Sequence, residues 1–142
     1  MRTWLYDTLV GSFELRTLFE YNTDDWPSQV MPRESQSVIP HKPFIIYGLG
    51  NNTNEDLSED PGHEAHRQFF QIWLHDEGGD YQRIDDALVI VKALLINKFH
   101  VPSKLTTVRW LENSQEFSNE TYNSIFRYAR FQAIISKGVT AA

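Results

Sequence analysis

The stretch HRQFFQIWLHDEGGDYQRIDDALVIVKALL, residues 66–95, decides the fold of this 142-residue chain because two periodicities meet in it. Its first part alternates with the period of two that is typical of a β-strand. One side of that strand is purely apolar: Phe70, Ile72 and Leu74. The other side mixes polar and aromatic groups: Phe69, Gln71, Trp73 and His75. The apolar side predicts a core, and the mixed side must be covered by another element or by another subunit.

The second part of the stretch predicts a turn and a long helix. Gly78 and Gly79 turn the chain, and Asp80 stands where a helix N-cap belongs. From Tyr81 onward an apolar stripe recurs at helical spacing: Ile84, Ala87, Leu88, Val91, Leu94 and Leu95. We therefore expect a strand over residues 67–76 followed directly by an amphipathic helix.

The segments on either side complete an α+β pattern. Thr3 is the expected N-cap of a first helix, with Trp4, Leu5 and Leu9 on one side, and Gly11 and Ser12 interrupt it. Four further strands are expected, and their residue ranges are 29–35 (at a sheet edge), 44–48, 106–113 and 124–136. The sequence thus predicts one domain, 1–142, with a mainly antiparallel sheet, an N-terminal helix and one long helix packed across the sheet.

Two segments predict mobility. Residues 51–64 contain five acidic side chains, no basic ones and a single aliphatic residue, so they predict a mobile acidic loop between two strands. The tail, residues 137–142, predicts a flexible end that orders only on contact.

Composition narrows the function classes. The chain has no cysteine, which excludes disulfides and thiolate chemistry, and its net charge of −6 argues against tight nucleic-acid binding. The charge is split, since residues 1–96 hold 16 acidic and 7 basic side chains, whereas residues 97–142 hold 3 and 6. Such a split either orients neighbouring copies or serves solubility. The polar N-terminus and the lack of a long apolar run predict neither a signal peptide nor a membrane span.

No motif predicts an active site or a cofactor. His63 and His66 are three residues apart, but they lead into a strand, where that spacing points the side chains to opposite faces. The sequence HDEGGD, residues 75–80, lacks the ligand spacing of a calcium loop and has no identified catalytic partner. We therefore expect a protein that is not an enzyme, and a metal-dependent hydrolase using this loop is a distant alternative.

The order of elements resembles that of tail terminator proteins of long-tailed bacteriophages. The resemblance is carried by RTWLYDTL (2–9), KPFIIYGLG (42–50), FQIWLHDEGGDYQRIDDAL (70–88) and SIFRYARFQAI (124–134). It implies a hexameric ring that binds the last ring of the tail tube, stops tube polymerisation and provides the joint to the head connector, with DNA passing through the lumen without specific binding. It further implies assembly in the host bacterial cytoplasm and a place in the tail-neck region of the virion. Another neck component, such as a tail-completion or head-closure protein, is the alternative.

A ring needs two different patches that meet between neighbours. Aromatic and arginine residues are enriched in interfaces, so we expect subunit or tail contacts from the second strand face and from the HDEGGDYQR turn. The candidates are Trp73, His75, Asp76, Glu77, Asp80, Tyr81, Arg83, Arg127, Tyr128 and Arg130. The competing interpretation is that Trp73 and Tyr128 pack beneath the N-terminal helix.

Overall fold

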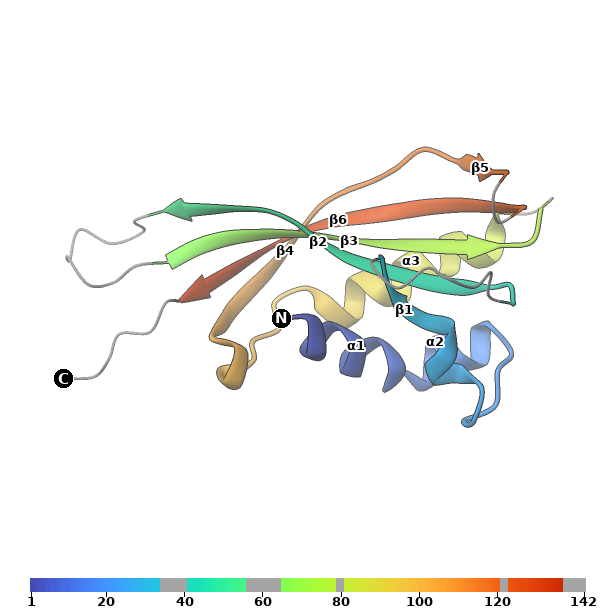
Figure 1. Cartoon of the computed structure of the whole chain (residues 1–142), viewed down its shortest axis with the longest axis horizontal. Helices are drawn as coiled ribbons and strands as arrows, with labels where there is room; N and C mark the ends of the chain where they lie inside the picture. Colours follow the sequence, from blue (N-terminus) through green and yellow to red (C-terminus); the bar gives the residue numbers. More distant parts are fainter. Residues whose placement is uncertain (34–40, 56–64, 79–80, 121–122, 137–142) are drawn as a thin grey trace.

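The structure is a computed structural model that describes residues 1–33, 41–55, 65–78, 81–120 and 123–136 (Figure 1). The helices are α1 (Arg2–Val10), α2 (Phe13–Leu18) and α3 (Gln82–Leu95), with short 3-10 helices η1 (Trp26–Gln29) and η3 (Val101–Ser103). The strands are β1 (Val30–Pro32), β2 (Phe44–Glu55), β3 (Ala65–Asp76), β4 (Leu105–Asn113), β5 (Phe117–Asn119) and β6 (Ser124–Ser136). The α+β prediction is confirmed.

The sheet is built around a long antiparallel pair, β3 and β6. These strands pair without a register shift from Ala65↔Ser136 to Asp76↔Ile125. The sheet order is β1-β2-β3-β6-β4, and β5 pairs with β6 beyond the end of β4. Among the described strands β1 alone runs parallel to its neighbour, and it lies at an edge as predicted. The mainly antiparallel prediction is therefore confirmed.

All three α-helices lie on the same face of this sheet (Figure 1). Helix α3 places the predicted apolar stripe against the sheet, because Ile84, Leu88 and Leu95 are buried in one cluster with Phe70 and Ile72 of β3. Trp4, Leu5 and Leu9 of α1 join the same cluster, as their spacing predicts. The molecule thus has two layers, with the core between helices and sheet.

Helix termini differ in part from the sequence predictions. Helix α1 begins at Arg2 with Met1 as N-cap, so the prediction of Thr3 as the cap is wrong. The first helix does end before Ser12, as expected. The Ser12 hydroxyl caps α2 by accepting a hydrogen bond from the Leu15 N–H. Helix α3 begins at Gln82 with Tyr81 at the N-cap position; Asp80 lies outside the described residues.

The predicted acidic loop is shorter than expected. Strand β2 continues to Glu55, which pairs with Ala65, so residues 51–55 are strand rather than loop. Pairing of residues 52–55 with β3 joins this segment to the sheet through the backbone whatever its side chains are, which composition does not register. Residues 56–64 and the predicted tail, 137–142, lie outside the described residues. No helix in the described part of the chain is long and apolar enough to span a membrane.

Two adjacent residues of α3 allow a test of the packing between the helices and the sheet. Leu88 is buried in the core, whereas the Val89 side chain is 69% exposed. Leu88→Ala should lower the free energy of unfolding by roughly 2–5 kcal/mol because it leaves a cavity. Val89→Ala should change it by less than about 0.5 kcal/mol. Urea unfolding of both variants measures the difference; equal losses would contradict the packing of α3 described above.

Candidate interaction surface

The sheet has a second face on which the described residues place no helix, and we call it the helix-free face. Register assigns the side chains to it, because directly paired residues in a sheet point to the same side. His75 is paired with Phe44 and Phe126, and Trp73 with Ile46 and Tyr128. By this register the helix-free face carries Phe44, Ile46, Gln71, Trp73, His75, Phe117, Phe126, Tyr128 and Arg130.

A row of four stacked rings crosses this face from β2 to β5. The ring centroids of Phe44 and His75 are 4.5 Å apart, and those of His75 and Phe126 are 4.9 Å apart. The row ends on Phe117, whose ring centroid lies 5.1 Å from that of Phe126. The three interplanar angles are 8°, 22° and 19°, so the rings lie almost parallel. Four strands are thereby locked together at one end of the sheet by direct cross-strand contact.

His75 is the polar member of that row. Its Nδ1 lies 2.8 Å from the Ser124 Oγ, and the side chain is buried between two phenyl rings. Burial lowers the pKa of His75 from 6.5 to about 4, because a charged imidazolium loses its hydration there. His75 is therefore neutral at physiological pH and serves as a structural member of the face.

A second row carries the larger aromatics and a cation. The Trp73 and Tyr128 rings lie 6.4 Å apart, and the Arg33 guanidinium lies 5.5 Å from the Trp73 ring centroid. Gly48 permits this approach, since a Cβ there would come within 3.2 Å of both the Trp73 ring and the Arg33 side chain. Trp73 and Tyr128 are half-buried. Both lie opposite the helical layer, so the interpretation that they pack beneath the N-terminal helix is wrong.

Arg130 lies on the helix-free face next to β4, where it is paired with Glu112. Its guanidinium Nη1 lies 3.1 Å from the Glu112 Oε1. Its Cζ lies 6.0 Å from the centroid of the Phe69 ring. Both partners of this ion pair are about half exposed, so the pair is screened by water and contributes little to stability. Its charged groups remain accessible to a partner.

Three other charged candidates, Asp76, Arg83 and Arg127, lie on the helix side, where their partners belong to the same chain. Arg83 of α3 donates two hydrogen bonds to the Asp76 carboxylate, 2.6 and 2.7 Å long. The Asp76 side chain is only 4% exposed, and hydrogen bonding to it raises the pKa of Arg83 further above its ordinary value. This bidentate pair fixes the start of α3 to the end of β3.

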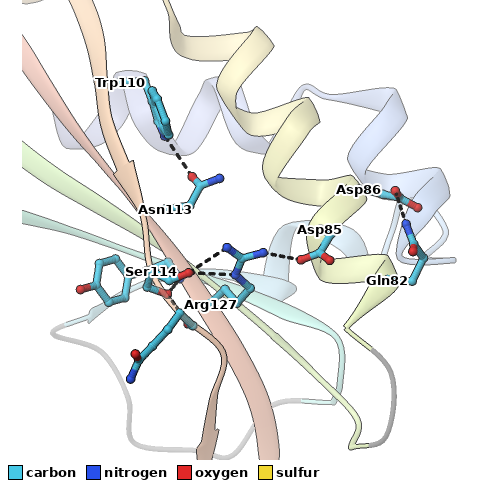
Figure 2. A network of polar contacts seen from close by, with 9 residues as sticks. Gln82, Asp85, Asp86, Trp110, Asn113, Ser114 and Arg127 are labelled. Atoms are coloured by element: carbon cyan, nitrogen blue, oxygen red, sulfur yellow. Dashed lines mark hydrogen bonds and ion pairs between the residues drawn. The ribbon is translucent and has the colours of Figure 1, made fainter.

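Arg127 makes the second such connection (Figure 2). Its guanidinium donates to the Asp85 carboxylate at 2.6 Å and, through Nε and Nη2, to the Ser114 carbonyl oxygen at 3.0 and 2.8 Å. Ser114 in turn exchanges hydrogen bonds with the backbone of Tyr128. Arg127 thus joins α3, the β4–β5 connection and β6, and it is placed on the opposite side of β6 from Arg130.

The predicted contact residues therefore fall into separate groups. Trp73, His75, Tyr128 and Arg130 lie on the helix-free face, whereas Asp76, Arg83 and Arg127 form intramolecular pairs on the helix side. The remaining three do not share one location. Glu77 is exposed at the turn, the Tyr81 hydroxyl donates to the Phe117 carbonyl oxygen, and Asp80 lies outside the described residues. Contact with a partner stays a prediction for all ten.

Sequence reasoning missed four residues of the helix-free face: Arg33, Phe44, Phe117 and Phe126. Phe126 is two residues from Tyr128 and so shares its side of the strand, but the role of Phe126 depends on its pairing with His75, which is remote in sequence. Among the described residues no three His, Asp or Glu side chains gather in a way that would hold a metal ion.

Comparison with known proteins adds one finding. No protein-family model matches the chain, and no curated protein matches it. Among solved structures, a chain of "Virion of native gene transfer agent (GTA) particle" is similar, with a TM-score of 0.67 and 16% sequence identity. The similarity covers 93% of this chain and 91% of that chain. The two chains therefore share one fold over nearly their whole lengths.

The burial of His75 predicts an acid-labile fold. An unfolded histidine takes up a proton near pH 6.5, whereas His75 in the folded chain resists protonation until about pH 4. Stability is thus fully present above pH 6.5 and falls as the pH drops from 6.5 to 4, by about 3 kcal/mol. Urea unfolding at several pH values measures this slope. His75→Phe should flatten it, while His41→Gln, at an exposed position, should retain it; an unchanged slope in His75→Phe would contradict the assignment.

Proposed function

We propose that this protein is a structural subunit of a phage-type virion, and more specifically a tail terminator. The observation that carries the proposal is the shared fold with a chain of a gene transfer agent virion, which extends over nearly all of both chains. The helix-free face supports it, since an aromatic and arginine-bearing sheet surface that no helix of the described residues covers is suited to contacts with other subunits.

In this proposal the protein works by association and carries out no chemistry. Copies of the chain form a closed ring, hexameric by the resemblance, at the head-proximal end of the tail tube. One side of the ring binds the last ring of tube protein and so stops tube polymerisation, and the opposite side receives the head connector. Arg130, Trp73 and Tyr128 are the proposed contacts on the helix-free face. No cofactor takes part, and the net charge of −6 lets DNA pass through the lumen without adhering.

A second position in the virion fits the same observation. Another neck component of this fold, such as a tail-completion or head-closure protein, would share both the fold and the helix-free face. The axial position in an assembled particle separates the two, because a terminator contacts the tube directly whereas a head-closure protein contacts the portal side.

The proposal is tested by assembly in solution. Light scattering after size-exclusion chromatography, with the protein alone and mixed with its tube protein, should show a ring of several copies, and electron microscopy should show tubes of limited length. Arg130→Glu should weaken this capping at least tenfold in the concentration required, because it reverses a charge on the helix-free face. Asp86→Lys reverses a charge on the exposed side of α3 and should cap normally. A protein that stays monomeric and leaves tube length unrestricted would refute the proposal.

A further inference from the structure

An exposed apolar tip lies where α3 connects to β4. Phe99 and Val101 are 72% and 76% exposed, which is unusual for side chains of this size. The tip is nevertheless well tied, because the N–H of His100 donates to the Leu105 carbonyl oxygen and the Leu105 N–H donates back. Lys98 and Lys104 flank it, and no acidic residue lies between them. We call residues 98–104 the basic tip.

A groove lies in the helical layer, next to the C-terminal end of α1. It has a volume of about 240 Å³, and its apolar lining comes from Val10, Phe13, Trp26 and Pro27. Trp26 is fixed there by a 2.9 Å hydrogen bond from its indole N–H to the Val10 carbonyl oxygen. Arg16 also lines the groove and lies over the Phe13 ring.

Three acidic residues are chain neighbours of this lining. Glu14, Asp24 and Asp25 are exposed and stand next to Phe13, Thr23 and Trp26 in the sequence, and they outnumber Arg16, which is the one charged residue of the lining itself. We call this site the acidic groove. Its apolar lining suits the exposed Phe99 and Val101 of the basic tip, and the acidic residues beside it are opposite in charge to Lys98 and Lys104.

The two sites are at opposite ends of one rigid helix. The basic tip adjoins the first turn of α1, where the Trp4 and His100 ring centroids are 6.4 Å apart. The acidic groove begins at Val10, the last residue of that helix. Nine residues separate the ends by roughly 13 Å, and Figure 1 shows the α3–β4 connection and α2 on opposite sides of α1. One copy of the chain therefore cannot fill its own groove with its own tip.

We infer that the basic tip of one copy inserts into the acidic groove of the next copy. The contact joins two different patches of identical subunits, so it is head-to-tail and either closes into a ring or continues as a filament. This inference rests on the proposed function for ring closure, and it names the surfaces that form the contact. It leaves the helix-free face available for the contacts named in the proposed function.

Engineered cysteines test the contact directly, because the natural chain contains none. A variant carrying Phe13→Cys and Val101→Cys should form a ladder of disulfide-linked oligomers under mild oxidation, and reduction should return it to a single band. The matched control carries Phe13→Cys and Val89→Cys, since Val89 is similarly exposed and lies outside the tip. A ladder in the control, or none in the first variant, overturns the inference.

Mixing two blocked variants provides a second, independent readout. Phe99→Ser with Val101→Ser removes the tip, and Asp24→Lys with Asp25→Lys reverses the charge of the groove. These four side chains are exposed, so the folds should be retained, which circular dichroism checks. Each variant alone should be monomeric, and the 1:1 mixture should give dimers only, because one intact tip meets one intact groove.

The outcomes separate this inference from the proposed function. If both blocked variants still form rings and cap tubes, the tip and groove are not the contact while the terminator role stands. If the blocked variants lose the ring and Arg130→Glu retains it but loses capping, both are supported. A wild-type protein that is monomeric alone and with tube protein overturns both.

Discussion

The structure depends on the unbroken antiparallel pairing of β3 with β6. Twelve successive residue pairs, from Ala65↔Ser136 to Asp76↔Ile125, hold one register without a bulge. Because side chains alternate along each strand, this one register decides which groups face the helices and which face away. A slip of a single residue would exchange Phe70 and Leu74 for Trp73 and His75 on the core side, and the helical layer would lose its apolar partner.

That register also gives the charged residues different roles on the two sides of the sheet. On the helix side, Asp76 and Arg127 are drawn into pairs with Arg83 and Asp85 of α3, which anchor the helix to the sheet. On the opposite side, the Arg130–Glu112 pair is half exposed and is not part of the core. Arginines only three residues apart in β6 therefore have different roles, one holding the fold together and one remaining accessible.

The molecule combines a rigid framework with surfaces that the framework does not use. The helical layer covers one side of the sheet, and the row of four rings stiffens the other side, on which the described part of the chain places no helix. Exposed apolar groups remain at the ends of the helical layer, at Phe13 and Phe99. Association would bury these groups further, which is consistent with the proposed assembly role, and the same fold occurs in a chain of a virion particle.

The sequence by itself determined the local elements. Alternation over 67–76 and the helical stripe from Ile84 to Leu95 predicted the strand, the helix and the core-facing row, because these periodicities follow from backbone geometry. It determined neither the cap at Met1 nor the extension of β2 to Glu55, since both depend on backbone hydrogen bonds rather than on composition.

Only the tertiary structure decided what the second face of the sheet is. Phe44, His75, Phe126 and Phe117 belong to four strands, and no local pattern shows that their rings stack. In β6 both sides carry an arginine and aromatic residues, so the sequence left its interior side open until pairing with β3 and the position of Asp85 assigned Arg127 to the helices. The physical reason is that strand register and layer packing join residues far apart in the chain, whereas periodicity reports only on near neighbours.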